Sequence, residues 1–241
     1  MKIVAIVALA AIAAVNAYSA LAEEPRLAPF IADYDVKYGS MSIGTNRTEL
    51  RRADTPGQWL IESRSNASGL ARLIAGGTLV QRSTFQLEAD GMRPLSYRFD
   101  DGTKQSKHDI SLDFDWGTGR VKGIAEGASV DIAVETDLQD AASMQAFVLL
   151  RLNGGTEPGM VAMIEKDSVK YYRYTLLRRE RLKTALGELD TLLYRSARDG
   201  STREVLLWYA PALGNVTVQA EQRRNGKKLF QTYIKGYRPG A

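Results

Sequence analysis

Residues 30–38 read Phe-Ile-Ala-Asp-Tyr-Asp-Val-Lys-Tyr, and this alternation of apolar and polar side chains decides the fold class. Because successive side chains of a strand point to opposite faces, such a segment predicts a strand with one solvated face. The same period of two recurs at residues 110–116, 129–135 and 215–221. Strands that are solvated on one face are typical of antiparallel sheets, since parallel sheets are covered on both faces.

Glycine-containing turn pairs separate the apolar runs, at Asp90-Gly91, Asp101-Gly102, Asp199-Gly200 and Asn225-Gly226. Such pairs supply the positive φ angles of the tightest hairpin turns, so each indicates a reversal between neighbouring strands. The predicted strands lie near residues 30–39, 41–53, 58–66, 78–88, 93–100, 104–116, 119–125, 128–135, 158–165, 168–183, 188–197, 203–210, 215–224 and 227–236.

Two segments do not follow the strand pattern. Residues 68–77 are too apolar for a solvent loop and too short for a long helix, so we expect them to cover one end of the sheet. Residues 137–152 predict a helix, with Asp137 as N-cap and Asp140 in the first turn. The predicted fold is therefore mainly β, a single curved antiparallel sheet or half-open barrel with one packed helix and a short apolar covering segment.

The N-terminus carries the three parts of a secretory signal peptide. Met1-Lys2 is basic, residues 3–15 are almost uninterruptedly apolar, and Ala20-Leu21-Ala22 is a small-x-small cleavage site. We predict cleavage after Ala22, with an uncleaved N-terminal anchor as the alternative, and the apolar run is shorter than the about 20 residues of a membrane-spanning helix. Residues 1–22 are then the signal peptide and residues 23–241 a single β-rich domain, soluble in the periplasm and without a transmembrane segment.

The composition excludes several kinds of chemistry. There is no cysteine, which removes lipid attachment at a cysteine, disulfides and thiol catalysis together. The formal net charge is +4, but 28 acidic residues are interspersed with the basic ones, so we expect no nucleic-acid partner.

No catalytic residue, metal site or cofactor is predicted. His108 is the single histidine, and we expect it to be structural or exposed on the predicted strand 104–116. The turn that Gly102 completes explains Asp100-Asp101, and the polar face of a strand explains Asp113 and Asp115. A calcium loop with ligands at EF-hand intervals does not occur.

The densest charged stretch is Arg178-Arg179-Glu180-Arg181-Leu182-Lys183, which follows Tyr171-Tyr172-Arg173-Tyr174. Basic residues interleaved with aromatic ones can hold phosphate groups, and in an exported protein the expected anionic partner is a lipid headgroup or a polysaccharide. Candidate contacts for an anionic group are therefore Arg178, Arg179 and Arg181. The alternative is a long strand whose rings pack inward while the arginines stay in water.

A family resemblance rests on the order of five segments: Tyr34-Asp35-Val36-Lys37-Tyr38-Gly39 with Ile43-Gly44, Pro94-Leu95-Ser96-Tyr97-Arg98, Asp140-Ala141-Ala142-Ser143 through Leu149-Leu150-Arg151, Ala185-Leu186-Gly187-Glu188-Leu189-Asp190-Thr191, and Val205-Leu206-Leu207-Trp208-Tyr209. In this order they resemble the DUF3108 family of exported bacterial proteins, a domain of unknown function. The resemblance spans nearly all of residues 23–241. It implies a β-rich envelope protein whose curved sheet is similar to half-barrel lipoprotein carriers. The chain departs from the family pattern at Ala210-Pro211, near the position where an aspartate is expected.

Three functions are compatible with these observations. The first is non-enzymatic binding of an apolar or amphipathic envelope ligand in the concavity of the sheet. The alternative is a structural or partner-binding envelope factor with a filled core, and the third is a hydrolase that acts on an envelope polymer. The expected partner is a lipid, an envelope polysaccharide or an envelope protein. The candidate ligand contacts are Leu70, Leu73, Ile74, Tyr172 and Tyr174.

Overall fold

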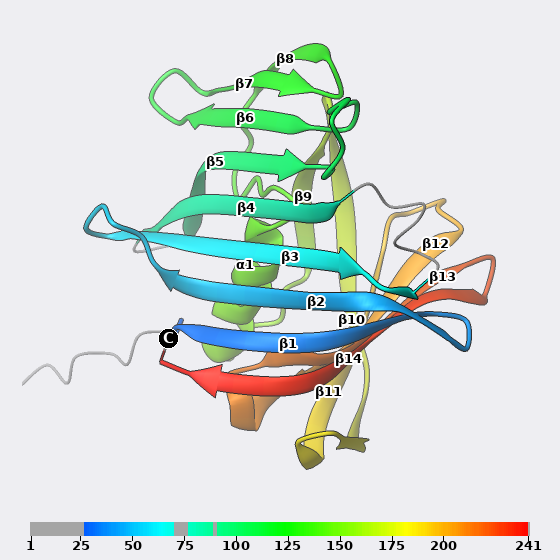
Figure 1. Cartoon of the computed structure of the whole chain (residues 1–241). Coiled ribbons are helices and arrows are strands. Elements are labelled where there is room, and N and C mark those ends of the chain that lie inside the picture. The colour runs from blue at the N-terminus through cyan, green and yellow to red at the C-terminus, as the bar shows by residue number, and fades with distance from the viewer. Residues whose placement is uncertain (1–26, 70–76, 89–90, 241) are drawn as a thin grey trace, which may run out of the picture.

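The structure, a computed structural model, describes residues 27–69, 77–88 and 91–240. In this part of the chain, the strands form one 14-stranded antiparallel sheet around a single α-helix, α1 (Ser143–Asn153), as Figure 1 shows. A 3-10 helix follows β12 at Pro211–Leu213. The strands are β1 (Phe30–Tyr38), β2 (Met41–Arg52), β3 (Gln58–Ala67), β4 (Thr78–Leu87), β5 (Met92–Asp100), β6 (Ile110–Asp115), β7 (Arg120–Ala125), β8 (Ala128–Ala133), β9 (Met160–Glu165), β10 (Ser168–Thr184), β11 (Gly187–Ala197), β12 (Arg203–Ala210), β13 (Val216–Arg224) and β14 (Lys227–Pro239).

The sheet consists of two meanders joined in the middle. Its strand order is β8-β7-β6-β5-β4-β3-β2-β1-β14-β13-β12-β11-β10-β9, so β1 pairs with β14 and the edges are β8 and β9. Sequential strands within each meander are antiparallel neighbours, and several of them are joined by short hairpin turns. At Asn225 and Gly226 the φ angles are 51° and 74°, as the tight turn predicted there requires. The expected antiparallel sheet is confirmed.

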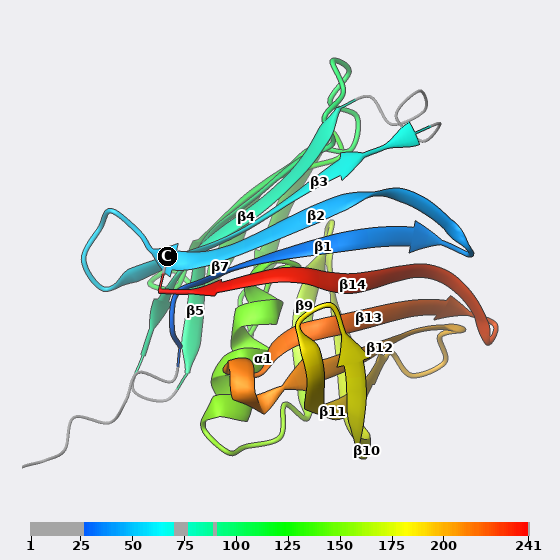
Figure 2. The ribbon, with the colours of Figure 1, turned by 60° about the horizontal axis from the view of Figure 1, so that its bottom comes forward.

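The sheet curls because several strand pairs carry β-bulges. The register shifts at Val36/Lys37 between β1 and β2, at Thr84/Phe85 between β4 and β5, and at Trp208/Tyr209 between β12 and β13. A bulge bends its strand and increases the local twist, which lets a long sheet wrap around a centre. Figures 1 and 2 show α1 inside this curve.

The two edges of the sheet lie close together without a backbone ladder between them. Tyr171 of β10 donates a hydrogen bond to Glu135, just after β8, at 2.6 Å. Lys166, in the β9–β10 turn, forms an ion pair with Glu126 in the β7–β8 turn. Since the described strands β8 and β9 do not pair with each other, the sheet is a half-open barrel, as expected from the alternation.

The segment before α1 crosses from one sheet edge to the other. Gln139 N donates to Ala162 O at 2.9 Å, and Ile164 N donates to Gln139 O at 2.8 Å, so residue 139 extends the edge at β9. The predicted helix start at residue 137 was wrong, because the backbone N–H and C=O groups of Gln139 bind β9 and are not available to a helix. Asp137 has a φ of 57° and is not the N-cap.

Helix α1 begins at Ser143 and is buried on nearly all sides. Ala146, Phe147, Val148 and Leu149 are all buried, and a helix that is apolar all round belongs in the interior of a protein. The described helices include none that is long and apolar enough to span a membrane.

The predicted strand at residues 104–116 was wrong in its first half. Strand β6 begins at Ile110, and residues 101–109 form a loop instead. Side-chain oxygen atoms of Asp101 accept hydrogen bonds from the backbone N–H groups of Thr103 and His108, so this loop satisfies its backbone locally and does not need a ladder. His108 therefore lies in a loop and not on a strand.

Candidate functional site

A cavity of about 330 Å³ lies in the concave face of the sheet, next to the first turns of α1. This volume is within the range of small-molecule sites in proteins. Its walls come from β1, β2 and β3 on one side and from β10, β12, β13 and β14 on the other. The lining residues are Phe30, Tyr34, Val36, Asn46, Thr48, Ile61, Ser63, Ser65, Met144, Gln145, Leu149, Tyr174, Leu207, Tyr209, Val216, Thr217, Ala220 and Thr232.

The cavity combines apolar side chains with neutral polar ones. Phe30, Ile61, Leu149 and Leu207 are among the apolar walls. Among the described residues that line the cavity, none carries a charge. Because transfer of an unpaired charge into such a space is costly, the cavity suits the uncharged part of a ligand.

A row of hydrogen-bonded polar side chains forms the wall at β2 and β3. Asn46 Nδ2 donates to Ser63 Oγ at 2.7 Å and to Ser65 Oγ at 2.9 Å. Thr48 Oγ1 donates to Asn46 Oδ1 at 3.1 Å. The wall is therefore polar but internally satisfied, and the hydroxyl groups retain lone pairs that can accept from a ligand.

Three tyrosines on different strands reach the cavity. Tyr34 Oη donates to Thr217 O at 2.8 Å, beside the bulge that displaces β13 from β12. Burial raises the pKa of Tyr34 and of Tyr209, and it raises the pKa of Tyr174 to about 12. All three phenols are therefore neutral hydrogen-bonding groups at physiological pH.

The predicted ligand contacts lie in different places. Tyr174 lines the cavity, whereas Tyr172 is outside its lining and donates to the carboxylate of Glu165. Leu70, Leu73 and Ile74 lie outside the described residues. Of the two predicted contacts that the structure describes, Tyr174 is at the cavity and Tyr172 is not, and the role of all five stays a prediction.

The predicted anion contacts are on the hairpin of β10 and β11, and all three are exposed. Arg178 forms an ion pair with Glu180 at 3.0 Å, and Arg181 forms one with Asp190 at 3.0 Å. Arg179 has no ion pair with a described residue. The structure therefore separates these arginines from the cavity, and their binding of an anionic group stays a prediction.

Arg178 lines a second hollow, a groove of about 450 Å³ that Trp208 and its neighbours also line. Arg195 and Glu204 are paired there at 3.4 Å, and Lys228 and Glu221 at 2.7 Å. Because these basic groups already face carboxylates, the groove is closer to a surface salt-bridge network than to an anion site.

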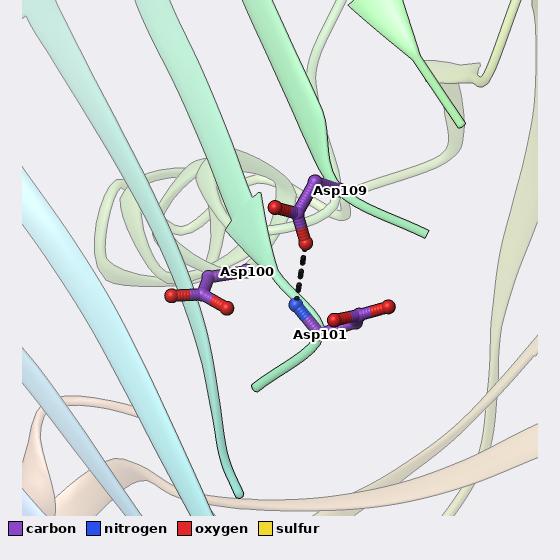
Figure 3. Close-up of side chains that lie close together, drawn as sticks. All are labelled: Asp100, Asp101 and Asp109. Atoms are coloured by element: carbon purple, nitrogen blue, oxygen red, sulfur yellow. Dashed lines mark hydrogen bonds between the residues drawn. The ribbon is translucent and has the colours of Figure 1, made fainter. Parts of the chain in front are cut away.

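Three carboxylates gather at the end of β5 and in the loop before β6, as Figure 3 shows. Asp109 Oδ1 accepts from Asp101 N at 2.9 Å, and Asp100 Oδ1 accepts from Gly102 N at 2.7 Å. Hydrogen bonds from Thr103 hold the pKa of Asp101 below its usual value. The cluster serves the backbone of its own loop, in agreement with the turn predicted at Asp100-Asp101.

Sequence reasoning missed the polar wall of the cavity. On β3 the hydroxyl residues Ser63 and Ser65 share the face of buried Ile61, and they alternate with the charged Glu62 and Arg64. Small hydroxyl residues at inward positions of a strand were the available signal. That signal identifies the face, but it does not show whether the space opposite is filled.

The fold and the cavity define a class of protein: a half-open antiparallel β-barrel that holds a helix and a neutral internal cavity. Within this class, the chain belongs to the family "Protein of unknown function (DUF3108)", whose model matches residues 33–228. The match confirms the family resemblance of the sequence, and it covers most of β1, all of β2 to β13 and the first two residues of β14.

Solved structures of low sequence identity are similar to this chain. A beta-barrel-like protein of the domain of unknown function DUF1849 from Brucella abortus is 11% identical, with a TM-score of 0.58 over 89% of this chain and 98% of that one. A proposed lipoprotein from Parabacteroides distasonis is 9% identical, with a TM-score of 0.38 over 89% of this chain and 97% of that one. A proposed exported protein with a YmcC-like fold from Bacteroides fragilis is 8% identical, with a TM-score of 0.39 over the same shares. A comparison with curated proteins gives no match.

Proposed function

We propose that this protein is exported to the periplasm after cleavage at Ala22 and binds an apolar or amphipathic ligand in the concavity of its sheet. The neutral cavity of about 330 Å³ is the observation that carries this proposal. The apolar N-terminal run of residues 3–15 and the cleavage site at residues 20–22 support export.

The lining of the cavity supports an amphipathic ligand rather than a purely apolar one. Phe30, Ile61 and Leu207 offer apolar contact, while the tyrosine and serine hydroxyl groups offer hydrogen bonds. A ligand with an apolar body and a few polar atoms would make apolar contacts with the first set of residues and hydrogen bonds with the second. A purely apolar ligand would desolvate the hydroxyl groups without replacing their hydrogen bonds, which costs free energy.

Binding is tested with an environment-sensitive fluorescent lipid analogue and with two matched variants. Ala220 lines the cavity, so Ala220→Phe places an aromatic ring in it and should abolish the fluorescence enhancement. Ala133 is exposed on β8, so Ala133→Phe adds the same ring elsewhere and should bind as the wild type does. Equal binding by wild type and Ala220→Phe would rule out the cavity as the site.

Export is tested on the protein recovered from the periplasmic fraction. Its intact mass should correspond to a chain that begins at Glu23, and native mass spectrometry should show a co-purifying small molecule. Retention of residues 1–22 in the membrane fraction would instead show an uncleaved anchor. An apo mass combined with an envelope protein captured by crosslinking would favour the partner-binding alternative.

A further inference from the structure

Three basic residues stand side by side near the turn between β13 and β14. Arg203 on β12 lies opposite Arg224 on β13, and Arg224 lies opposite Lys227 on β14. All three are exposed, and we call them the basic trio. Like charges directly opposite each other on neighbouring strands destabilise a sheet, so the fold alone does not account for this arrangement.

The basic trio lies on the same face of the sheet as the cavity. Leu207 and Ala220 line the cavity and pair with each other. Arg203 is four residues before Leu207, and Arg224 is four residues after Ala220, with a regular register between these positions. An even number of residues returns to the same face, and a rise of about 3.3 Å per residue places the trio roughly 13 Å from the cavity wall.

Figure 2 shows the β13–β14 turn at the end of the sheet away from α1. The end of β1 lies beside it, since Gly39 N donates to Leu229 O at 3.3 Å. The trio is therefore at the rim of the concavity, on the side that the helix leaves open.

No described acidic residue neutralises the basic trio. Glu204 and Glu221 are the acids on β12 and β13. Both form their ion pairs with basic residues of the second groove, the one that Arg178 and Trp208 line. By contrast Arg198, just beyond β11, is held by Glu165 at 3.2 Å. Within the described part of the chain, the trio thus presents positive charge without a partner.

An exposed aromatic pair connects the cavity with the basic trio. The rings of Tyr38 and Phe230 are 5.3 Å apart, and the two residues are 49% and 41% exposed. Each lies two residues beyond a cavity residue, Val36 on β1 and Thr232 on β14, which places the rings on the cavity face. Apolar surface therefore continues from the cavity to the charged rim.

We propose that the basic trio binds the anionic headgroup of an amphiphile whose apolar part lies along Tyr38 and Phe230 and enters the cavity. This inference rests on the proposed function and names the class of its ligand. Guanidinium groups can bind a carboxylate or phosphate with two parallel hydrogen bonds, and the lysine adds a point charge. The charge stays at the solvated rim, so the neutral cavity receives only the uncharged part.

The experiment compares a long-chain fatty acid with the alcohol of the same length, by calorimetry on the mature protein at neutral pH. The test variant is R203Q/R224Q/K227Q. The matched control is R179Q/R181Q/K183Q, which removes the same charge from exposed positions on the β10–β11 hairpin. The wild type and the control should bind the acid more tightly than the alcohol. The test variant should lose about tenfold or more in affinity for the acid and keep its affinity for the alcohol.

The outcomes separate this inference from the proposed function. If the wild type binds neither compound, the proposed function fails and this inference fails with it. If the wild type and the test variant bind acid and alcohol equally well, ligand binding in the cavity is supported and the proposed headgroup site is wrong. If the R179Q/R181Q/K183Q control loses the acid instead, the anion contacts are on the hairpin. Full displacement of the acid by millimolar inorganic phosphate would show a site for free anions, and the proposal of an amphiphile would be wrong.

Discussion

Ser83 Oγ donates a hydrogen bond of 2.6 Å to Asp140 Oδ2, and neither residue is accessible to solvent. The bond joins β4 to the segment that precedes α1. The other oxygen of Asp140 accepts from the backbone N–H groups of Ala142 and Ser143, both at 2.8 Å. Asp140 therefore ties the start of the helix to the sheet, whereas the sequence predicted Asp137 as the N-cap and Asp140 in the first turn.

The burial of Asp140 predicts a pH dependence of stability. Burial raises the pKa of Asp140 from 3.8 to about 6. The folded state therefore binds a proton more tightly than the unfolded state, and the associated stability is fully present below about pH 4 and lost as pH rises through 6. The loss is on the order of 2–3 kcal/mol.

Asp140→Asn removes this titration and keeps an oxygen for the backbone N–H groups. As the pH rises from 4 to 7, the wild type should lose unfolding free energy through this titration and Asp140→Asn should not. The stability of the variant relative to the wild type should therefore increase over this range. Urea denaturation at each pH measures it. A constant difference would show that Asp140 does not titrate there. Asp140→Ala also loses the acceptor of the Ala142 and Ser143 N–H groups, so it should be less stable than Asp140→Asn at every pH.

Removal of the hydroxyl group of Tyr34 should destabilise the cavity wall. Tyr34→Phe leaves the half-buried carbonyl of Thr217 without its donor, which costs about 1 kcal/mol in unfolding free energy. Tyr38 is 49% exposed, so Tyr38→Phe serves as the control and should leave stability unchanged. Equal effects of the two variants would show that the Tyr34 hydrogen bond contributes nothing.

The proximity of the sheet edges can be tested by crosslinking, since the chain has no cysteine of its own. Glu126→Cys combined with Lys166→Cys should react with a short bis-maleimide to give an intramolecular crosslink, seen as a single mass increment without free thiol. Glu126→Cys combined with Glu188→Cys is the control, because residue 188 lies on the β10–β11 hairpin, at the other end of the long strand β10. Absence of the first crosslink would show that the barrel is open at this edge.

Gly123 on β7 should tolerate no side chain. A Cβ there would lie 1.9 Å from Ser111 O on β6, and the φ of this residue is 153°. Gly127 has a φ of 81°, but a methyl group there would displace no neighbour, since nothing lies within 4 Å of the position that its Cβ would take. We expect Gly127→Ala to cost about 1–2 kcal/mol and Gly123→Ala to cost more than about 3 kcal/mol, measured by chemical denaturation. Equal costs would contradict the close approach of β6 and β7.

Much of the sheet could be predicted because its signals are local. Alternation and turn chemistry depend on neighbouring residues, so strands such as β1 and β13 follow from the sequence to within a few residues. The loop at residues 101–109 and the start of α1 could not be predicted in the same way. There, side chains such as Asp101 and Asp140 bind backbone groups that a local pattern assigns to a strand or to a longer helix.

The sequence by itself determined the class of this protein: antiparallel strands with one solvated face, one packed helix that was predicted at residues 137–152, and the order of segments shared with its family. Only the tertiary structure decided which inward strand faces pack against each other and which leave the cavity between them. Tyr34, Ser63 and Thr217 are far apart in sequence and come together because bulges curl the sheet and α1 fills part of its concavity. A cavity is the volume that packing leaves unfilled, and that volume depends on all the elements around it at once.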